Sequence, residues 1–470
     1  MLFNSLHYFI FCFITIPIFF LLNEKKQRTF LLWISVYFYA CLKIIFLPIL
    51  LLSFISTFYT SIKIDESKEK FKKRIWLFLS LFVNLGILLF FKYTDFLRSI
   101  YYDVIHYTGS DKIFEPYNII LPLGISFYTF QAIAYTIDIY REEIPAEKDF
   151  SRFSLFLLFF PQLVAGPIMR ASVLIHQFDG RKYFSKKNLN EGLPLIAFGI
   201  FKKTIIADPI STLITPIYNN PSDYNALTIL CAMMFFSIQI YCDFAGYSDI
   251  AIGTGKILGF EIPLNFKRPF LAASTTELWQ RWHISLSTWL RDYVYISLGG
   301  NRGFKIQKYF NLFITMVIGG IWHGAAWTFV LWGTLNAIIL TTERYFSDNN
   351  WLGPFQKIPR FIKIIFTFLV FVFSGHFFRA PNMNNALIMY SKLANISEYF
   401  QSSPILIPSI LIPMFALVLY EIAEEMNMIV FIKENYYFSK LIQPVTFAIF
   451  FVSFMIYTVT SSPQFYYFQF

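Results

Sequence analysis

Charged residues are scarce in this chain. Only 14% of its 470 residues are Asp, Glu, Lys or Arg, whereas an average soluble domain carries about 25%. Hydrophobic residues make up 56% of the chain and aromatic residues 21%. The composition therefore excludes an ordinary soluble protein. It predicts an all-α integral membrane protein, because helices satisfy their own backbone hydrogen bonds in lipid.

Cysteine is also scarce and follows no pattern. The four cysteines are scattered through apolar surroundings, at Cys12, Cys41, Cys231 and Cys242. Because no CxxC pair or other metal-ligand spacing occurs, the sequence indicates neither a disulfide framework nor a zinc site.

Acidic residues are fewer than basic ones, 29 against 39, which gives a net charge of +10. Such a charge can indicate nucleic-acid binding. Here the Lys and Arg residues lie in short loops between apolar runs, where the positive-inside rule places cytoplasmic charge. We therefore expect contact with a bilayer and no nucleic-acid partner.

Long apolar runs dominate the rest of the chain and predict about 10–13 membrane helices, with re-entrant or interfacial segments among them. The run 29–62 is too long for one helix, and Lys43 and Pro48 mark the expected turn. The run 153–168 contains two prolines and a glycine, which predict a segment that enters the membrane without crossing it. The runs lie at 4–22, 29–46, 47–62, 75–97, 118–139, 153–168, 193–217, 226–252, 310–340, 361–378, 404–420 and 441–460.

The basic loops predict the topology. Three basic residues follow the first apolar run and no signal-cleavage site is recognisable, so we expect the N-terminus outside the cytoplasm. The aromatic residues 465–468 would then lie near the external interface, with the C-terminus also extracytoplasmic. The loops expected in the cytoplasm are 23–28, 63–74, 140–152, 343–363 and 421–440.

The chain shows no soluble domain, linker or clear internal repeat. We therefore expect one membrane domain over 1–470. It consists of N-terminal helices in 1–150, core segments in 151–345 and C-terminal helices in 346–470.

One histidine lies inside a long apolar run. His323 belongs to the segment 319–327, GGIWHGAAW, in the middle of the run 310–340, which is long enough to span a bilayer. An ionisable group at membrane depth is expensive and so suggests function. The flanking Gly320 and Gly324 would leave open space around the ring. The alternatives are a hydrogen-bonded core histidine and glycines that serve only close helix packing.

A second histidine lies in a basic, tryptophan-rich segment. Ser274 and Glu277 have capping-box spacing, so we expect one helix over 275–295. Glu277 and Arg281 have the i,i+4 spacing of an ion pair. His283 lies on the flank of this helix, near Gln280, Ser287 and Leu290. One face would carry Trp279, Trp282, Leu286, Trp289 and Tyr293. The alternative is a surface helix with tryptophan anchors.

These segments resemble the membrane-bound O-acyltransferase family, in its bacterial branch of alginate O-acetylation membrane proteins. Three blocks carry the resemblance: FFPQLVAGPI at 159–168, RWHISLSTWLRDY at 281–293 and GIWHGAAW at 320–327. GISFYTFQ at 124–131 and DFAGYSD at 243–249 support it. The resemblance follows the whole chain in order and spacing. Cys242 departs from it, since the related pattern often has an aromatic residue there.

The resemblance implies a fold of many membrane helices around a central tunnel or funnel, in a bacterial inner membrane. It implies transfer of an acyl group, above all acetyl, from a cytoplasmic thioester such as acetyl-CoA to an extracytoplasmic hydroxyl. The family's catalytic histidine matches His323 and its second histidine matches His283. Its partners are extracytoplasmic SGNH-type proteins that pass the acyl group to a cell-surface polysaccharide.

Acyl transfer from a thioester needs a base, an oxyanion donor and the exclusion of water. His323 would be the base, and His283 would orient the acceptor, share the proton or stabilise charge. Backbone N–H groups near Gly319, Gly320 or Gly324 are candidate oxyanion donors. The further residues expected to bind the donor or support the site are Trp322, Gly324, Gln280, Arg281, Ser287, Arg291, Asp292, Arg302 and Asp243.

Basic residues around the second histidine would meet the phosphates of coenzyme A, because guanidinium groups bind phosphate through paired hydrogen bonds. The alternative is contact with anionic lipid headgroups. Asp243 and Asp249 would pair with basic residues to hold the site. The basic cluster consists of Lys267, Arg268, Arg281, Arg291, Arg302 and Lys305.

Other functions remain open at this point. Within the family, the reaction could be D-alanyl transfer to teichoic acid or peptidoglycan O-acetylation. A transporter or flippase would also have interrupted helices and intramembrane polar residues. The two histidine blocks and the lack of a detectable inverted repeat favour the enzyme.

Overall fold

The computed structural model describes residues 3, 5–109, 114–163, 166–351, 353–400 and 408–428. The expected helix 441–460, the aromatic residues 465–468 and the C-terminus lie outside the described residues, as do Val164 and Ala165 of the FFPQLVAGPI block.

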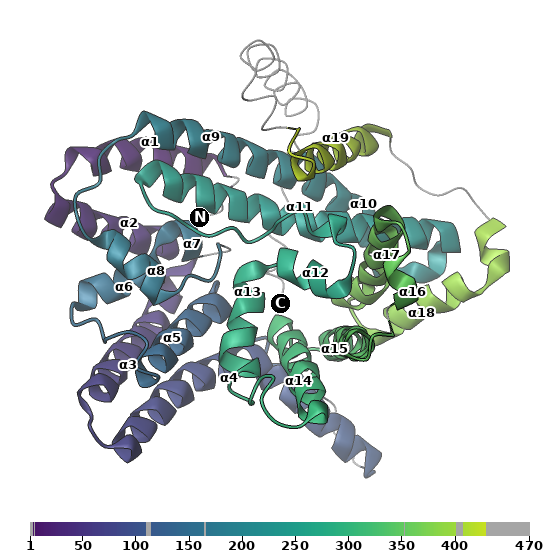
Figure 1. The fold of residues 1–470 in the computed structure, drawn as a ribbon, viewed down its shortest axis with the longest axis horizontal. Helices are drawn as coiled ribbons and strands as arrows, with labels where there is room; N and C mark the ends of the chain where they lie inside the picture. Colours follow the sequence, from purple (N-terminus) through teal and green to yellow (C-terminus); the bar gives the residue numbers. More distant parts are fainter. Residues whose placement is uncertain are drawn as a thin grey trace.

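Every regular element in these ranges is helical, as the composition predicted (Figure 1). Four helical segments there are long and apolar enough to cross a membrane: Ile44–Glu66, Lys70–Tyr107, Ala226–Leu258 and Arg360–Arg379. The α-helices are α1 (Leu6–Leu21), α2 (Glu24–Lys43), α3 (Leu47–Glu66), α4 (Lys70–Tyr107), α5 (Ile125–Tyr140), α6 (Phe150–Leu158), α7 (Phe160–Leu163), α8 (Ala171–Leu174), α9 (Lys186–Ile200), α10 (Asp208–Asn219), α11 (Ala226–Leu258), α12 (Thr275–Arg281), α13 (Ile284–Leu290), α14 (Lys305–His323), α15 (Trp327–Asp348), α16 (Gly353–Gln356), α17 (Arg360–Arg379), α18 (Met383–Ala394) and α19 (Pro408–Glu425).

The long helix α11 connects the two sides of the molecule. In Figure 1 most of the helices α1–α8 gather on the left and α15–α18 lie on the right, α4 extends past α14 to the lower right, and α9 and α11 run beside each other across the top. Gly246 and Gly253 of α11 face Gly199 and Gly192 of α9 so closely that a methyl group on Gly246 would lie 2.7 Å from the Gly199 carbonyl oxygen. Small residues at a helix contact let two backbones approach within a membrane.

The N-terminal helices are joined by short polar contacts. Asn84 of α4 accepts a hydrogen bond from the Ser53 hydroxyl of α3 (2.6 Å) and donates to the Thr57 hydroxyl (2.9 Å). The turn expected between Lys43 and Pro48 is confirmed, since α2 ends at Lys43 and α3 begins at Leu47. Hydrogen bonds between buried polar side chains help hold such helices together where lipid offers no competing partner.

The run 153–168 is interrupted, as its prolines predicted. Helix α6 ends at Leu158, and α7 begins at Phe160 after one non-helical residue. All side chains from Phe153 to Leu163 are buried in protein, the setting in which irregular backbone is tolerated at membrane depth.

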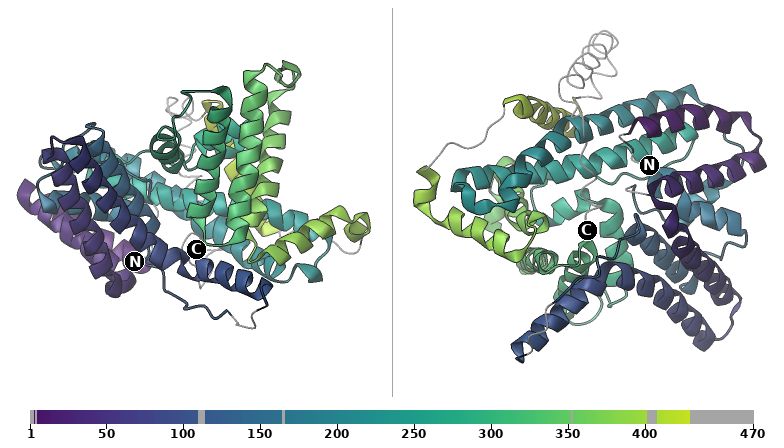
Figure 2. Two further views of the ribbon diagram at one scale, coloured as in Figure 1. Left: turned by 90° about the horizontal axis from the view of Figure 1, so that it is seen from below. Right: turned by 180° about the vertical axis from the view of Figure 1, so that it is seen from behind.

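The apolar run 310–340, although long enough to span a bilayer, is not one helix. The chain forms a hairpin instead: α14 ends at His323, and α15 begins at Trp327 after three non-helical residues. The two helices lie side by side and antiparallel, since Lys308 near the start of α14 pairs with Asp348 at the end of α15. In the left view of Figure 2 they are neighbours in the row of green helices, with α17 next to α15. Gly320 and Gly333 face each other where the helices approach most closely.

The prediction of one helix over 275–295 is wrong. Helix α12 ends at Arg281 and α13 starts at Ile284, and residues 291–295 form a π-helical turn. The apolar periodicity continues across the break, so it could not reveal it. Backbone contacts fix the break instead: the Lys267 N–H donates to the Arg281 carbonyl and the Ile284 N–H to the Asn265 carbonyl, both at 2.9 Å.

We expect Gly320→Ala to destabilise the protein, because the added methyl group would lie 2.7 Å from the Gly333 Cα and push α14 away from α15. Overpacking of this kind costs about 1–3 kcal/mol. The melting temperature of the purified protein in detergent, measured by scanning fluorimetry, should fall. Gly86→Ala in α4 is the matched control, because nothing lies within 4 Å of its added Cβ. Equal effects of the two substitutions would contradict this account.

Candidate active site

His323 is the last residue of α14 and lies in an aromatic box. Its side chain is buried, with a residue exposure of 6%. The ring centroids of Trp322, Trp332 and Phe378 lie 4.9, 5.1 and 5.0 Å from that of His323. The break after His323 places this imidazole at the end of a helix, among apolar rings that exclude water.

The glycines beside His323 do not leave the open space that the sequence suggested. A Cβ on Gly324 would lie 2.2 Å from the Phe329 ring, and one on Gly320 would meet Gly333. The other role considered for Gly320 and Gly324, close packing, describes them better. Gly319 differs, since it lines a cavity beside the imidazole.

Lys92 of α4 holds the end of α14, and the sequence analysis did not single it out. Its ammonium donates to the carbonyl oxygens of Trp322 (2.6 Å) and His323 (3.0 Å), while the Tyr93 hydroxyl donates to the Ile321 carbonyl (2.8 Å). The last carbonyls of a helix have no partner within it, and a cation complements its negative end. The sequence carried one sign of this role, a charged lysine inside the apolar run 75–97.

His283 occupies the break between α12 and α13 in a left-handed conformation, with φ +43°. Only glycine and, less often, Asn or Asp adopt this conformation readily, and strained residues cluster at functional sites. The side chain is buried, and its Nδ1 accepts a hydrogen bond from the Leu286 N–H at 3.2 Å. The neutral ring therefore carries its proton on Nε2, which finds no hydrogen-bond partner among the described residues.

Asn265 supports the strained turn around His283. Its side-chain oxygen accepts hydrogen bonds from the Ser285 N–H (3.2 Å) and hydroxyl (2.9 Å). Asn265 is completely buried, yet nothing in its sequence spacing distinguished it from a loop residue.

Trp322 stands between the two histidines. Its ring centroid lies 4.9 Å from that of His323 and 6.4 Å from that of His283. It also stacks at 5.0 Å on Phe130, which stacks at 3.7 Å on Trp289. The indole N–H is buried and has no partner in the part of the chain that the structure describes. Two buried polar hydrogens, on His283 and Trp322, are therefore available beside His323.

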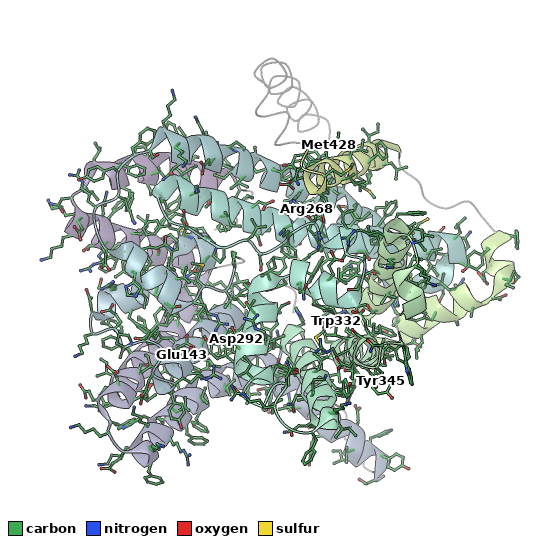
Figure 3. The ribbon with its side chains drawn as sticks, viewed as in Figure 1. Glu143, Arg268, Asp292, Trp332, Tyr345 and Met428 are labelled. Atoms are coloured by element: carbon green, nitrogen blue, oxygen red, sulfur yellow. The ribbon has the colours of Figure 1, made fainter. Side chains whose placement is uncertain are left out.

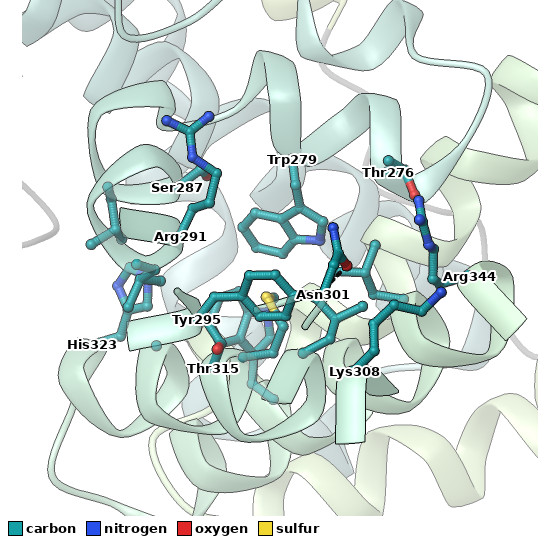
Figure 4. Close-up of a pocket in the computed structure, with 17 residues that line it drawn as sticks. Thr276, Trp279, Ser287, Arg291, Tyr295, Asn301, Lys308, Thr315, His323 and Arg344 are labelled. Carbon is teal, nitrogen blue, oxygen red and sulfur yellow. Dashed lines mark hydrogen bonds between the residues drawn. The ribbon is translucent and has the colours of Figure 1, made fainter. Parts of the chain in front are cut away.

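A cavity of about 280 Å³ reaches His323 from one side, between α12, α13, α14 and α15. In Figure 4, His323 and the basic pair Lys308 and Arg344 lie at opposite sides of it, with the rings of Trp279 and Tyr295 between them. Its residues include Trp279, Leu286, Ser287, Leu290, Arg291, Tyr295, Asn301, Lys308, Met316, Gly319, His323, Trp332 and Arg344.

A second cavity, of about 470 Å³, lies behind the aromatic box. Phe329 and Phe378 line it, and Phe378 also contacts His323, so one ring separates this cavity from the imidazole. The other residues around it are Phe91, Lys92, Ile119, Leu121, Ala325, Ala326, Thr328, Arg379, Ala380 and Pro381.

Some of the expected site residues join the first cavity and others do not. Ser287 and Arg291 line it together with His323. Asp292 pairs instead with Arg170 (2.9 Å) and Arg291 (2.7 Å). Gln280 and Arg302 are exposed and are not among the residues that line the cavity.

Arg281 belongs to an ion-pair cluster away from the cavity. The expected pair with Glu277 is confirmed at 2.7 Å, and Arg281 also pairs with Glu425 of α19 at 2.8 Å. Arg268 joins the same α19 carboxylate at 2.7 Å, and Figure 3 places it beside that helix. Burial raises the pKa of the Glu277 carboxyl, but the Ala273 N–H and nearby guanidinium groups outweigh it, so this pKa lies below its ordinary value.

The expected basic cluster is therefore divided. Of its members only Arg291 lines the first cavity, where Lys308 and Arg344 take the places foreseen for the others. Both come from the α14–α15 hairpin, and both pair with Asp348 at its open end. Because the hairpin was not foreseen, these two cations could not be assigned to the site from the sequence.

Asp243 and Asp249 pair with basic residues, as expected. Asp243 lies 2.8 Å from Lys203, which also contacts Asp208 at 2.6 Å, and Asp249 lies 2.9 Å from Lys202. Both lysines belong to a π-helical stretch, Phe201–Ala207. These buried ion pairs join the π-helical stretch to α11.

Comparison with known proteins agrees with this geometry. Residues 141–380, which contain both histidines, match the model of the membrane-bound O-acyltransferase family. This chain belongs to the membrane-bound O-acyltransferase family. The resemblance seen in the sequence is confirmed, and the chain is a multi-pass membrane O-acyltransferase.

Curated relatives of this acyltransferase share most of its length. It is 38% identical over 397 residues to a probable alginate O-acetylase AlgI of Pseudomonas aeruginosa, covering 83% of this chain and 75% of the relative. It is 35% identical over 391 residues to a peptidoglycan O-acetyltransferase of Helicobacter pylori, covering 78% and 73%. A teichoic acid D-alanyltransferase of Bacillus subtilis is 31% identical over 287 residues, covering 56% and 70%.

We expect Lys92→Met to lower the turnover of this acyltransferase at least tenfold, because two carbonyl groups at the end of α14 lose their donor and His323 loses its fixed position. Hydrogen bonds to a charged group contribute about 1.5–3 kcal/mol each. Initial rates of acyl transfer by purified protein should show a fall in kcat with little change in donor KM. Lys63→Met, at an exposed lysine of α3, is the control. A Lys92→Met enzyme with the kcat of the control would contradict the positioning role.

Proposed function

We propose that this acyltransferase moves an acetyl group from cytoplasmic acetyl-CoA, bound in the first cavity, to a hydroxyl of an extracytoplasmic glycan or its carrier protein that approaches from the second. The observation that carries the proposal is the pair of buried imidazoles that both contact Trp322, one of which, His323, lines the first cavity. His323, His283 and the cavity's basic residues then have different roles.

The two histidines divide the chemistry. His283 Nδ1 already accepts a hydrogen bond, so its Nε2–H is a donor suited to the oxyanion of a tetrahedral intermediate. His323 is then the general base. As the acceptor oxygen bonds to the acyl carbon, its proton passes to His323. When the carbon–sulfur bond breaks, the leaving thiolate takes this proton.

The aromatic box supports the same chemistry. Trp322, Trp332 and Phe378 surround the His323 ring and leave little room for water. A thioester in a dry site is protected from hydrolysis, and electrostatic interactions there are stronger than in water. The acceptor hydroxyl would then be the nucleophile that attacks the acyl carbon, without competition from water.

The first cavity suits a phosphorylated thioester. Lys308 and Arg344 line it on the far side from His323 in Figure 4, and Arg291 lines it on the same side as His323. Cationic side chains bind phosphate oxygens by charge-assisted hydrogen bonds. A thioester arm extending from the far-side cations along Trp279 and Tyr295 would bring its acyl end to His323.

The two cavities open toward opposite ends of α5. Arg141, after α5, donates to the Asp292 carbonyl (3.1 Å) beside the first cavity, whereas Ile119, before α5, lines the second. Arg28 in the first basic segment pairs with Asp149 at 3.1 Å, so this segment lies at the first-cavity end. The positive-inside rule makes that end cytoplasmic, which supports an extracytoplasmic N-terminus and a bacterial inner membrane.

The relatives favour acetyl as the cargo and a glycan as the final acceptor. The alginate O-acetylase and peptidoglycan O-acetyltransferase match more of this chain, at higher identity, than the teichoic acid D-alanyltransferase does. An extracytoplasmic SGNH-type protein, as the family resemblance implies, would pass the acetyl group to the glycan.

Replacing the base should remove transfer. We expect His323→Ala to lower acetyl transfer about 10²–10⁴-fold, the contribution of a positioned general base. The measurement is the transfer of radiolabelled acetyl from acetyl-CoA to a glycan acceptor by purified protein. His7→Ala, at a histidine of α1 whose Nε2 lies 3.2 Å from the Tyr37 hydroxyl, is the matched control. Normal transfer by His323→Ala would refute the assignment.

His283→Asn separates the chemical role of His283 from its backbone role. Asn tolerates the left-handed conformation and can accept the Leu286 N–H, but it lacks the Nε2–H group. We expect a folded protein with unchanged melting temperature and about 10²–10³-fold lower kcat, the loss seen when an oxyanion donor is removed. A variant with full activity would exclude His283 as the oxyanion donor.

A further inference from the structure

Two residues beside the site have a strained backbone, and they lie on adjacent segments. His283 and Arg268 are both left-handed, with φ +43° and +47°. The backbone hydrogen bonds that separate α12 from α13 join the segments that carry them, 265–268 and 281–284. Residues other than glycine keep such a conformation only where the surrounding contacts over-determine it. Contacts beyond these two backbone bonds are therefore expected to hold the pair of segments together.

Glu425 at the end of α19 contacts both segments. Its Oε2 lies 2.7 Å from Arg268 Nε, and its Oε1 lies 2.8 Å from Arg281 Nη2. Arg281 Nη1 also donates to Oε2 at 3.1 Å, so this guanidinium engages both oxygens. Paired, charge-assisted hydrogen bonds fix geometry as well as charge. These hydrogen bonds, those from Arg281 above all, hold the pKa of the Glu425 carboxyl well below its ordinary value, so the carboxylate stays ionised at neutral pH.

Among the described residues, the neighbouring carboxylates each pair with one of the two arginines. Glu424 pairs with Arg268 at 3.0 Å, and Glu277 pairs with Arg281 at 2.7 Å. The structural explanation of such a cluster is a gain in stability, and ion pairs near solvent contribute little of it. Without Glu425 each arginine would keep a carboxylate partner, and the link between the two segments would be the contact that is lost.

Helix α19 is anchored apart from this contact. The Tyr241 hydroxyl of α11 donates to Glu421, which lies one turn before Glu425, and both side chains are buried. The helix also lies beside the π-helical stretch Phe201–Ala207. It begins after the segment 141–380 that matches the family model. Glu425 is therefore a fixed point that the rest of the fold supplies to the turn.

We propose that Glu425 is a positioning residue for His283. By holding Arg268 and Arg281 together it keeps the strained turn closed, and the closed turn keeps the His283 Nε2–H in place for the oxyanion. This inference rests on the proposed function, because it takes His283 as the oxyanion donor. Neither arginine lines the first cavity, so the carboxylate acts through the backbone of the turn and not through donor binding.

Acyl-transfer kinetics of the purified full chain test the proposal. We expect Glu425→Ala to lower kcat about tenfold with little change in donor KM, because a misplacement of about 1 Å can cost about 10²-fold in rate. Glu424→Ala removes the same charge from the preceding position of α19 but keeps the link, so its kcat should stay near the wild-type value. Equal kcat values in Glu425→Ala and Glu424→Ala would overturn the inference.

Glu425→Gln keeps the size of the side chain and one acceptor oxygen. It should lower kcat in the same direction as Glu425→Ala but by less, and it provides the readout if the alanine variant does not fold. Wild-type kcat in a folded Glu425→Gln protein whose turn is open would overturn the inference.

The double variant His283→Asn/Glu425→Ala separates positioning from a general loss of stability. If Glu425 acts through His283, the double variant should be no slower than His283→Asn alone, because the group that Glu425 positions is already gone. Independent effects would instead multiply. A kcat reduced by the product of the two single losses would overturn the inference.

Hydrogen–deuterium exchange of the same purified proteins, read by mass spectrometry, requires no acyl donor. The Lys267 and Ile284 N–H groups close the turn, so peptides that contain them should exchange faster in Glu425→Ala and at the wild-type rate in Glu424→Ala. Peptides from α4 should not change. Unchanged exchange of both turn segments in Glu425→Ala would overturn the inference.

Exchange and kinetics together keep the two proposals apart. If the turn exchanges faster in Glu425→Ala while His283→Asn keeps full activity, the oxyanion role of His283 is wrong and the hold of Glu425 on the turn stands. If His283→Asn loses activity while Glu425→Ala keeps it, the proposed role of His283 stands and the inference fails.

Discussion

The end of a helix within the membrane domain is the constraint on which this site depends. Helix α14 stops at His323, and its last carbonyls would be left without partners in an apolar interior. Lys92 and Tyr93 of α4 supply the missing donors. The same contacts fix the His323 imidazole beside the first cavity, so the residues that satisfy the backbone of α14 also position this side chain. A continuous span would have needed no such lysine.

At the second histidine, too, the contacts that hold the backbone also fix the side chain. The break at His283 costs strain, since its backbone is left-handed, and it is over-determined by Asn265 on one side and the Leu286 N–H on the other. That hydrogen bond decides the tautomer and leaves one N–H directed to no protein group among the described residues. Trp322 contacts both imidazoles and stacks on Phe130, so apolar rings surround this part of the site.

Local signals predicted well where neighbours in sequence are also neighbours in space. The turn after Lys43 and the pair of Glu277 with Arg281 follow from helix geometry alone and are present. The single helix expected over 275–295 is broken, and so is the apolar run 310–340, for a common reason. Apolar periodicity persists through a break when both sides of it are buried, and the contacts that cause the break come from distant residues.

The sequence by itself determined that this is a helical membrane acyltransferase whose two histidine blocks stand in the order of its family, because composition and motif order do not depend on packing. Only the tertiary structure decided which charges serve the site. It directed Arg281 to α19, brought Lys308 and Arg344 to the first cavity, and turned Lys92 toward the end of α14. These choices depend on contacts between helices far apart in the chain, and no spacing along the sequence encodes the distance between two helices.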